Sequence, residues 1–285
     1  MKARSSHLSL PFSLAVNRAG RKVKIPLGGS GVGLHDALRH VFWTGSWKAQ
    51  VLERLITGDC PVVVDVGVNT GQTLLEVFIT HPNATYLGFE PIPACAAYAS
   101  RLIHANGWQT ATLLCAALAA NEDVIPLYRH AGAPADSAAT TLQDLRPGLA
   151  FDVDWVPCLR FDTVKATLRL APIDLIKIDV EGSELEVVKG MEETLSSSRP
   201  VILCEVLFTD SAADIEATTR RNEELMRRLT AAGYRVWQLI KSADLKTVQS
   251  VRPVQEFPRE YWTPANAELC DYLFLPEEKY RDFFW

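Results

Sequence analysis

The 285 residues suffice for one large domain, or one domain with an extension, and 48% hydrophobic with 22% charged residues is typical of a globular, soluble chain. A net charge of −5 argues against a duplex nucleic-acid binder, which usually carries a basic excess. No apolar run reaches the roughly 18 residues that a membrane-spanning helix needs.

The first part of the chain, residues 1–58, is predicted to be an extension or cap with a short strand, a glycine-rich turn and one or two helices. Its apolar stretch is broken by Pro11 and lacks a clear small-residue cleavage site, so we expect no secretory signal. Residues 28–47 are interpreted either as a lid over a substrate or as a capping helix whose aromatic side chains fill the core. The side chains concerned are those of His35, His40, Trp43 and Trp47.

Strands and helices alternate from residue 59 to residue 285, and we predict one domain there. Strands are expected over 60–67, 84–91, 110–118, 173–182, 199–208, 233–240 and 271–278, and helices over 70–81, 93–107, 183–195 and 214–232. This alternation predicts an α/β fold with a mostly parallel, seven-stranded sheet and helices on both faces. The last strand should be antiparallel, because only loop is predicted before it, and residues 121–172 look less regular.

The stretch "VVVDVGVNTGQT", residues 62–73, places Asp65 near the end of a buried strand, immediately before a tight turn. Ligands of open α/β sheets bind at such strand ends. Only Gly67 matches the three glycines of the dinucleotide fingerprint G-x-G-x-x-G, and the P-loop signature G-K-[ST] is absent. A carboxylate beside this turn is also poorly suited to a pyrophosphate.

A positively charged ligand without phosphate fits these residues better, and S-adenosylmethionine carries both an ammonium and a sulfonium. Asp65 could attract its amino-acid end, most simply through water. Glu90, at the end of the next strand, could accept hydrogen bonds from both ribose hydroxyls, as acidic residues do in nucleotide-binding folds. The alternative is an ordinary strand-to-helix turn with an acidic side chain nearby.

Four segments, "VVVDVGVNTGQT", "YLGFEP", "AALAANED" and "IDLIKIDVEGSELEVVKG", resemble the FkbM-type methyltransferases over about residues 50–210. The resemblance implies a Rossmann-like class I methyltransferase fold and O-methylation with S-adenosylmethionine, often of a sugar or a natural product. By position it implies that the cofactor is bound by Asp65, Gly67, Asn69, Gly71, Glu90, at its ribose, and Ala117, near its adenine. Thr70 and Asp179 are also predicted to bind the cofactor. Val68 departs from the family pattern, in which a small residue is common, and should narrow the turn.

The acidic segment "IKIDVEG" has its own physical meaning. The two-residue period of a strand puts Lys177, Asp179 and Glu181 on one face. A buried lysine needs a partner, and Asp179 or Glu205 on the next strand could pair with it. That ion pair is one reading, and the other is that Asp179 and Glu181 face the methyl group and its acceptor.

Methyl transfer to a hydroxyl requires alignment of the reacting atoms and removal of a proton. Glu181 is the first candidate for the base and His130 the second, although a histidine in such a loop is often only solvated. A divalent metal held by Asp179, Glu181 and Glu205 is conceivable, but the sequence shows no dedicated ligand spacing, so no metal is predicted.

Two further segments are candidates for contact with the acceptor or with a second subunit. Tyr261 and Trp262 could stack on a sugar or another ring. The terminal "YRDFFW", residues 280–285, could pack on the sheet or form a homodimer interface.

The resulting hypothesis is an S-adenosylmethionine-dependent O-methyltransferase that acts on a small-molecule or glycan hydroxyl, with no nucleic-acid partner and no membrane span. A cytoplasmic location is expected, because the six cysteines are far apart and form no C-x-x-C pair. Two alternatives stay open, a nicotinamide-dependent oxidoreductase on a similar fold and a non-catalytic binding protein that kept the fold.

Overall fold

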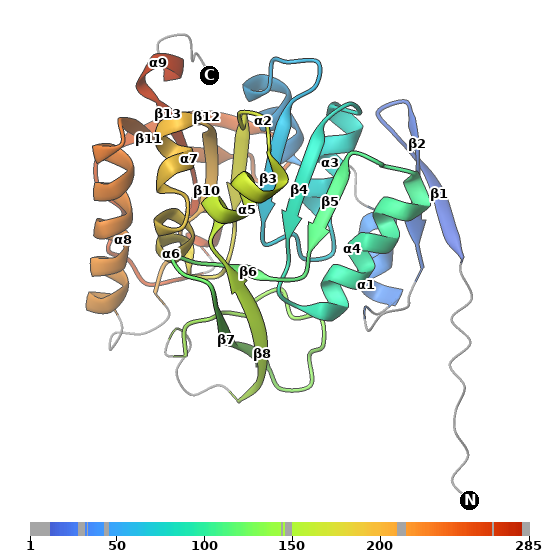
Figure 1. Ribbon diagram of the computed structural model, residues 1–285, viewed down its shortest axis with the longest axis horizontal. Coiled ribbons are helices and arrows are strands. Elements are labelled where there is room, and N and C mark those ends of the chain that lie inside the picture. Colours follow the sequence, from blue (N-terminus) through green and yellow to red (C-terminus); the bar gives the residue numbers. More distant parts are fainter. Residues whose placement is uncertain are drawn as a thin grey trace, which may run out of the picture.

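The computed structural model describes residues 12–27, 32, 34–42, 46–143, 145, 150–209, 215–263 and 265–280. Its centre is an eight-stranded sheet of order β12-β11-β13-β10-β9-β3-β4-β5 (Figure 1). The strands are β3 (Val62–Val66), β4 (Thr85–Phe89), β5 (Ala111–Leu114), β9 (Leu175–Ile178), β10 (Val201–Glu205), β11 (Tyr234–Lys241), β12 (Val248–Val254) and β13 (Asp271–Pro276).

Helices cover both faces of this sheet, as the alternating elements predict. The helices are α1 (Leu34–Phe42), α2 (Trp47–Leu55), α3 (Gln72–Thr80), α4 (Pro93–Asn106), α5 (Phe161–Leu168), α6 (Glu184–Lys189), α7 (Glu192–Ser197), α8 (Ile215–Ala231) and α9 (Glu277–Tyr280). Strand β3 shows why two layers form: Val64 packs in the core on the side of α5 to α8, whereas Val63 packs with α2, α3 and α4. Among the described residues, no helix has the length and apolar character needed to cross a membrane.

The predicted fold class is confirmed, including the reversed last strand. β3, β4, β5, β9 and β10 pair in parallel, whereas β13 runs antiparallel to both β10 and β11. The sheet has one strand more than predicted, because β12 lies in the segment that was expected to be loop. It pairs antiparallel with β11 at the edge of the sheet.

Two regions are more regular than the sequence indicates. The extension contains a hairpin of β1 (Ser13–Arg18) and β2 (Arg21–Pro26) in place of a single strand. A separate three-stranded sheet of order β6-β8-β7 is formed by β6 (Ala117–Leu118), β7 (Asp123–His130) and β8 (Phe151–Leu159). This small sheet projects beyond the carboxyl ends of the central parallel strands, where ligands of such folds bind (Figure 1).

The helix expected over 183–195 is divided into α6 and α7. No capping box forms at its start, because the Ser183 hydroxyl lies 2.5 Å from that of Thr141, and Glu186 pairs with Arg221. Gly190 separates the two helices, and a Cβ there would lie 2.3 Å from the carbonyl oxygen of Ala119. Close approach of two backbones therefore explains the break better than helix propensity does.

Candidate cofactor and acceptor site

The turn after β3 is shaped by three residues with positive φ, Gly67 at +84°, Asn69 at +51° and Gly71 at +93°. Gly67 lies so close to β9 that an added Cβ would be 1.9 Å from the carbonyl oxygen of Asp179. Val68 is accommodated by Gly88 on β4, where a Cβ would meet a Val68 methyl at 2.7 Å. The larger side chain at position 68 is thus matched by a glycine on the neighbouring strand.

We expect Gly67→Ala to lower the free energy of unfolding by about 2–5 kcal/mol, since it adds a clash to a left-handed backbone that costs alanine about 1–2 kcal/mol. Gly107→Ala is the matched control, because Gly107 has a φ of +69° and nothing within 4 Å of an added Cβ. Urea unfolding of the two variants measures the difference. Equal losses would show that the approach to Asp179 imposes no constraint of its own.

Glu90 lies directly after β4, and its carboxylate is buried beside the same turn. Its Oε2 accepts a hydrogen bond from the Asn69 amide at 2.7 Å, and its Oε1 accepts one from the Ile92 amide at 2.8 Å. Burial raises the pKa of Glu90 to about 7, although the two amides and Lys177 oppose the shift. Each oxygen keeps a second lone pair, so the carboxylate can still accept hydrogen bonds from a vicinal diol.

Asp65 occupies a different position from the one expected of a ligand-binding group. It is fully buried, and its carboxylate accepts a hydrogen bond from the Tyr86 hydroxyl at 2.6 Å. The Nζ of Lys177 lies 3.2 Å from Asp65 and 3.2 Å from Asp179, and donates to the Gly67 carbonyl at 2.6 Å. The expectation that Asp65 contacts the cofactor is therefore revised: its partner is Lys177, and together they hold the turn.

Asp179 thus lies in the ion pair predicted for Lys177 and also faces the cavity. Burial alone would lower the pKa of Lys177, but Asp179 and Asp65 hold it above its ordinary value. Burial would likewise raise the pKa of Asp179, yet Lys177 and Lys48 lower it to about 2. Asp179 is therefore a carboxylate at neutral pH and is poorly suited to accept a proton during a reaction.

A cavity of about 350 Å³, here called the strand-end cavity, lies at the carboxyl ends of β3, β4 and β9. Of the predicted cofactor-binding residues, its lining includes Gly67, Asn69, Glu90, Ala117 and Asp179. Thr70 and Gly71 are not in this lining, and the Thr70 hydroxyl lies 3.0 Å from Nε2 of His40. These two residues therefore act behind the cavity wall, by shaping the turn.

A second cavity of about 440 Å³, here called the side cavity, is lined by His130, Glu181, Glu205, Trp262 and apolar side chains that include Phe208. Glu181 and Glu205 also line the strand-end cavity, so the two cavities meet at these carboxylates. The structure thereby brings both candidate bases to the side cavity, whereas only Glu181 also reaches the strand-end cavity. Nδ1 of His130 lies 2.9 Å from Asp136.

The backbone holds Glu181 in an uncommon conformation. Its φ is +55°, and its carbonyl accepts a hydrogen bond from the Thr140 hydroxyl at 2.7 Å. A left-handed backbone at a residue other than glycine is unfavourable and is found disproportionately at functional sites. The strain supports a functional role for the Glu181 side chain.

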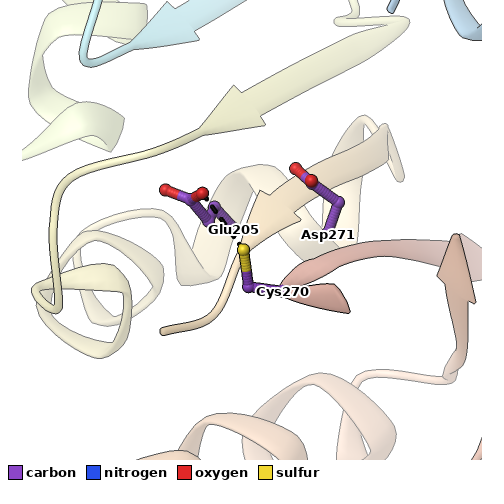
Figure 2. Close-up of side chains that lie close together, drawn as sticks. All are labelled: Glu205, Cys270 and Asp271. Atoms are coloured by element: carbon purple, nitrogen blue, oxygen red, sulfur yellow. Dashed lines mark hydrogen bonds between the residues drawn. The ribbon is translucent and has the colours of Figure 1, made fainter. Parts of the chain in front are cut away.

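Glu205 ends β10 between Asp179 and the start of β13. Figure 2 shows the Cys270 thiol against its carboxylate, with Asp271 beside them, and Sγ of Cys270 lies 3.2 Å from Oε1. Burial, together with Asp179 and Asp271, raises the pKa of Glu205 well above its ordinary value. Burial and the neighbouring carboxylates thus favour the protonated form of Glu205.

Within the described residues, the carboxylates of Asp179, Glu181 and Glu205 each have an oxygen within 4.8 Å of the others, as a metal site would require. Nζ of Lys177 lies 3.2 Å from Asp179, and the pKa of Glu205 is raised well above its ordinary value. The sequence shows no dedicated ligand spacing either, so a site without metal stays a prediction.

Of the four aromatic residues considered for a lid, the structure describes the side chains of two. His40 and Trp47 are buried: His40 stacks on Tyr98 with 5.7 Å between ring centroids, and Trp47 belongs to a core cluster. For these two the capping interpretation is correct, and the lid interpretation is wrong. Trp43 and the His35 side chain lie outside the described residues, as does the terminal aromatic segment 281–285 with the Tyr280 side chain.

A family model for the methyltransferase FkbM domain matches residues 65–236. The chain belongs to the FkbM methyltransferase family. This confirms the resemblance read from the sequence motifs, and the strand order with its reversed strand β13 agrees with a class I methyltransferase fold. The matched region contains Asp65, Glu90, Asp179 and Glu181, but it excludes α1 and α2.

Two curated relatives in this family are similar over part of their length. Methyltransferase sdnD of Sordaria araneosa is 31% identical over 159 residues, which cover 47% of this chain and 61% of sdnD. The 31-O-demethyl-FK506 methyltransferase FkbM of Streptomyces tacrolimicus is 28% identical over 176 residues, which cover 53% of this chain and 67% of that protein. The alignments thus span less than two thirds of sdnD and about two thirds of the second relative.

Among solved structures, methyltransferase FkbM from Methylobacillus flagellatus KT is 14% identical, with a TM-score of 0.47, over 77% of this chain and 44% of that one. Precorrin-6y C5,15-methyltransferase from Geobacter metallireducens GS-15 is also 14% identical, with a TM-score of 0.39, over 80% of this chain and 84% of that one.

Proposed function

We propose that the protein transfers a methyl group from S-adenosylmethionine to a hydroxyl group of a small molecule or sugar. The observation that carries this proposal is the meeting of two cavities at Glu181 and Glu205, one beside Glu90 and the other beside Trp262. The curated relative that methylates 31-O-demethyl-FK506 supports a natural-product acceptor by its name. We assign residues 59–285 to the methyltransferase domain and residues 1–58 to a cap.

The donor set suits S-adenosylmethionine. Glu90 offers two oxygen acceptors for the ribose hydroxyls, and Ala117, which lines the same cavity, would lie near the adenine. Asn69 and Gly67 form the floor between Glu90 and Asp179. When bound, S-adenosylmethionine supplies an electrophilic methyl group on its sulfonium.

In this arrangement Glu181 accepts the proton of the acceptor hydroxyl. Its carboxylate lies at the junction of the cavities, where acceptor oxygen and methyl donor must meet. Lys177 lowers the pKa of Asp179, and the raised pKa of Glu205 favours its protonated form, so Glu181 is the best placed of the three to receive a proton. Phe208 and Trp262 would pack against the body of the acceptor.

Calorimetric titration with S-adenosylhomocysteine, the expected product, tests this proposal, with NAD as the comparison. Binding of S-adenosylhomocysteine alone supports a methyltransferase. Binding of NAD alone would favour the oxidoreductase alternative. Binding of S-adenosylhomocysteine without methyl transfer to any hydroxylated acceptor would favour a non-catalytic protein.

We expect Glu90→Ala to weaken S-adenosylhomocysteine binding by about 1–3 kcal/mol, the range for lost hydrogen bonds to a charged group. Because the ionised carboxylate is the better acceptor and the pKa of Glu90 is about 7, affinity should rise as the pH increases from 6 to 8. Glu90→Gln should remove most of this pH dependence. An unchanged affinity of Glu90→Ala in calorimetry would contradict the position assigned to the ribose.

A further inference from the structure

Two basic side chains from the N-terminal cap line the strand-end cavity. Arg39 projects from α1 and Lys48 from the first turn of α2, and both precede the region matched by the family model. Arg39 forms no hydrogen bond or ion pair within the described part of the chain. Nζ of Lys48 lies 3.9 Å from Asp179, to which Lys177 is closer at 3.2 Å. The cavity therefore presents positive charge that its own carboxylates pair only weakly.

The cap is fixed against the turn, so these charges have defined positions. His40, one residue after Arg39, lies 3.0 Å from the Thr70 hydroxyl, and both side chains are buried. Ser46 accepts a hydrogen bond from the Lys48 amide at 3.0 Å and donates one to Glu76 of α3 at 2.6 Å. Lys48 thus emerges from a capped helix start that is tied to the helix after the turn.

The order of strands gives the direction of the methyl donor in the cavity. Glu90 follows β4, the turn follows β3, and Asp179 follows β9, and neighbouring strands are about 4.8 Å apart. With its ribose at Glu90, the donor spans roughly 10 Å to bring its amino-acid end to β9. Lys48 lies at that end, since it contacts Asp179.

We propose that Lys48, assisted by Arg39, binds the α-carboxylate of S-adenosylmethionine, while Asp179 accepts the adjacent ammonium. This inference rests on the proposed function and extends it, because it makes the cap part of the donor site. On the cavity wall a cation, Lys48, lies beside an anion, Asp179. These two charges are complementary to the carboxylate and the ammonium of an amino acid. When the ammonium of the ligand contacts Asp179, its α-carboxylate lies next to the carboxylates of Asp179 and Glu181. Without Lys48 this arrangement would be unfavourable, because like charges repel.

The test compares two ligands that differ only in the carboxylate, S-adenosylhomocysteine and its decarboxylated analogue S-adenosyl-3-thiopropylamine. Calorimetry should show that the unmodified protein binds S-adenosylhomocysteine at least about tenfold more tightly. Lys48→Gln should weaken S-adenosylhomocysteine binding by about tenfold to a hundredfold, as expected for a lost charge-assisted contact. Arg39→Gln should cause a smaller loss, because its side chain is exposed.

Binding of the decarboxylated analogue should stay within about twofold in both variants. Lys22→Gln on the exposed face of the β1–β2 hairpin is the control for loss of a positive charge, and should leave both affinities unchanged. Melting curves establish that the variants are folded. Equal losses for the two ligands, or equal affinities in the unmodified protein, would overturn the inference while leaving the proposed function intact. Failure of the unmodified protein to bind either ligand would overturn both.

Discussion

Glu181→Gln is expected to lower kcat by about a hundredfold to ten-thousandfold, the range for removal of a general base. Glutamine keeps the size of the side chain but cannot take up a proton. Affinity for S-adenosylhomocysteine should remain within about twofold, because the proposed donor contacts lie at Glu90, Asp179 and Lys48. The measurement is the release of S-adenosylhomocysteine with a hydroxylated acceptor selected by screening the unmodified protein.

His130→Gln is the matched control for this experiment. His130 lines the side cavity, is held by Asp136, and does not reach the strand-end cavity. Its replacement should therefore lower kcat by less than about tenfold and act mainly on KM for the acceptor. A large loss of kcat in His130→Gln with near-normal turnover in Glu181→Gln would reverse the two roles.

The sequence predicts the site best where a residue's role follows from its place at a strand end. Glu90, Asn69 and Asp179 reach the strand-end cavity because parallel strands end at one edge of the sheet. Asp65 was misinterpreted, since its direction depends on Lys177, its partner in the β3–β9 register. Both strands are buried on two faces, so their sequences lack the alternation of apolar and polar residues that would have revealed this pairing.

The surroundings of Glu205 and the position of Lys48 could not be predicted from the sequence. The surroundings of Glu205 come from Cys270, which is 65 residues further along the chain, and from the reversed strand that follows it. Lys48 belongs to a cap without a recognisable motif, and only the packing of α1 and α2 on the turn brings it to the cavity. Contacts between residues so far apart in the chain leave no recognisable pattern in a short stretch of sequence.

In the fold, too, the elements with a clear local sequence pattern were predicted, and those without one were missed. The apolar parallel strands of the centre were predicted because their burial is continuous, as in β3 and β9. β12 was missed because it is an edge strand with mostly exposed side chains and contains Pro253. Pro126 in β7 and Pro157 in β8 concealed the small sheet in the same way.

Lys177→Met should destabilise the protein strongly, because it removes the cation from a buried ion triad. The Lys177 side chain is 4% exposed and lies between Asp65 and Asp179, and it also donates to the backbone of the turn at Gly67. Breaking a buried pair by removing one partner typically costs about 3–5 kcal/mol, since the remaining charge is left uncompensated. The free energy of unfolding in urea should fall by that amount.

The double variant Asp65→Asn/Lys177→Met separates the ion pair from simple packing. With Asp65 neutralised, its uncompensated buried charge disappears, while the amide can still accept the hydrogen bond from Tyr86, so part of the lost stability should return. Lys246→Met provides the surface control and should change stability by less than about 0.5 kcal/mol, because its ion pair with Asp244 is largely exposed. The outcome that would contradict this is a double variant less stable than Lys177→Met by the full cost of Asp65→Asn alone. The two residues would then be independent, and the triad would not be what holds the turn against β9.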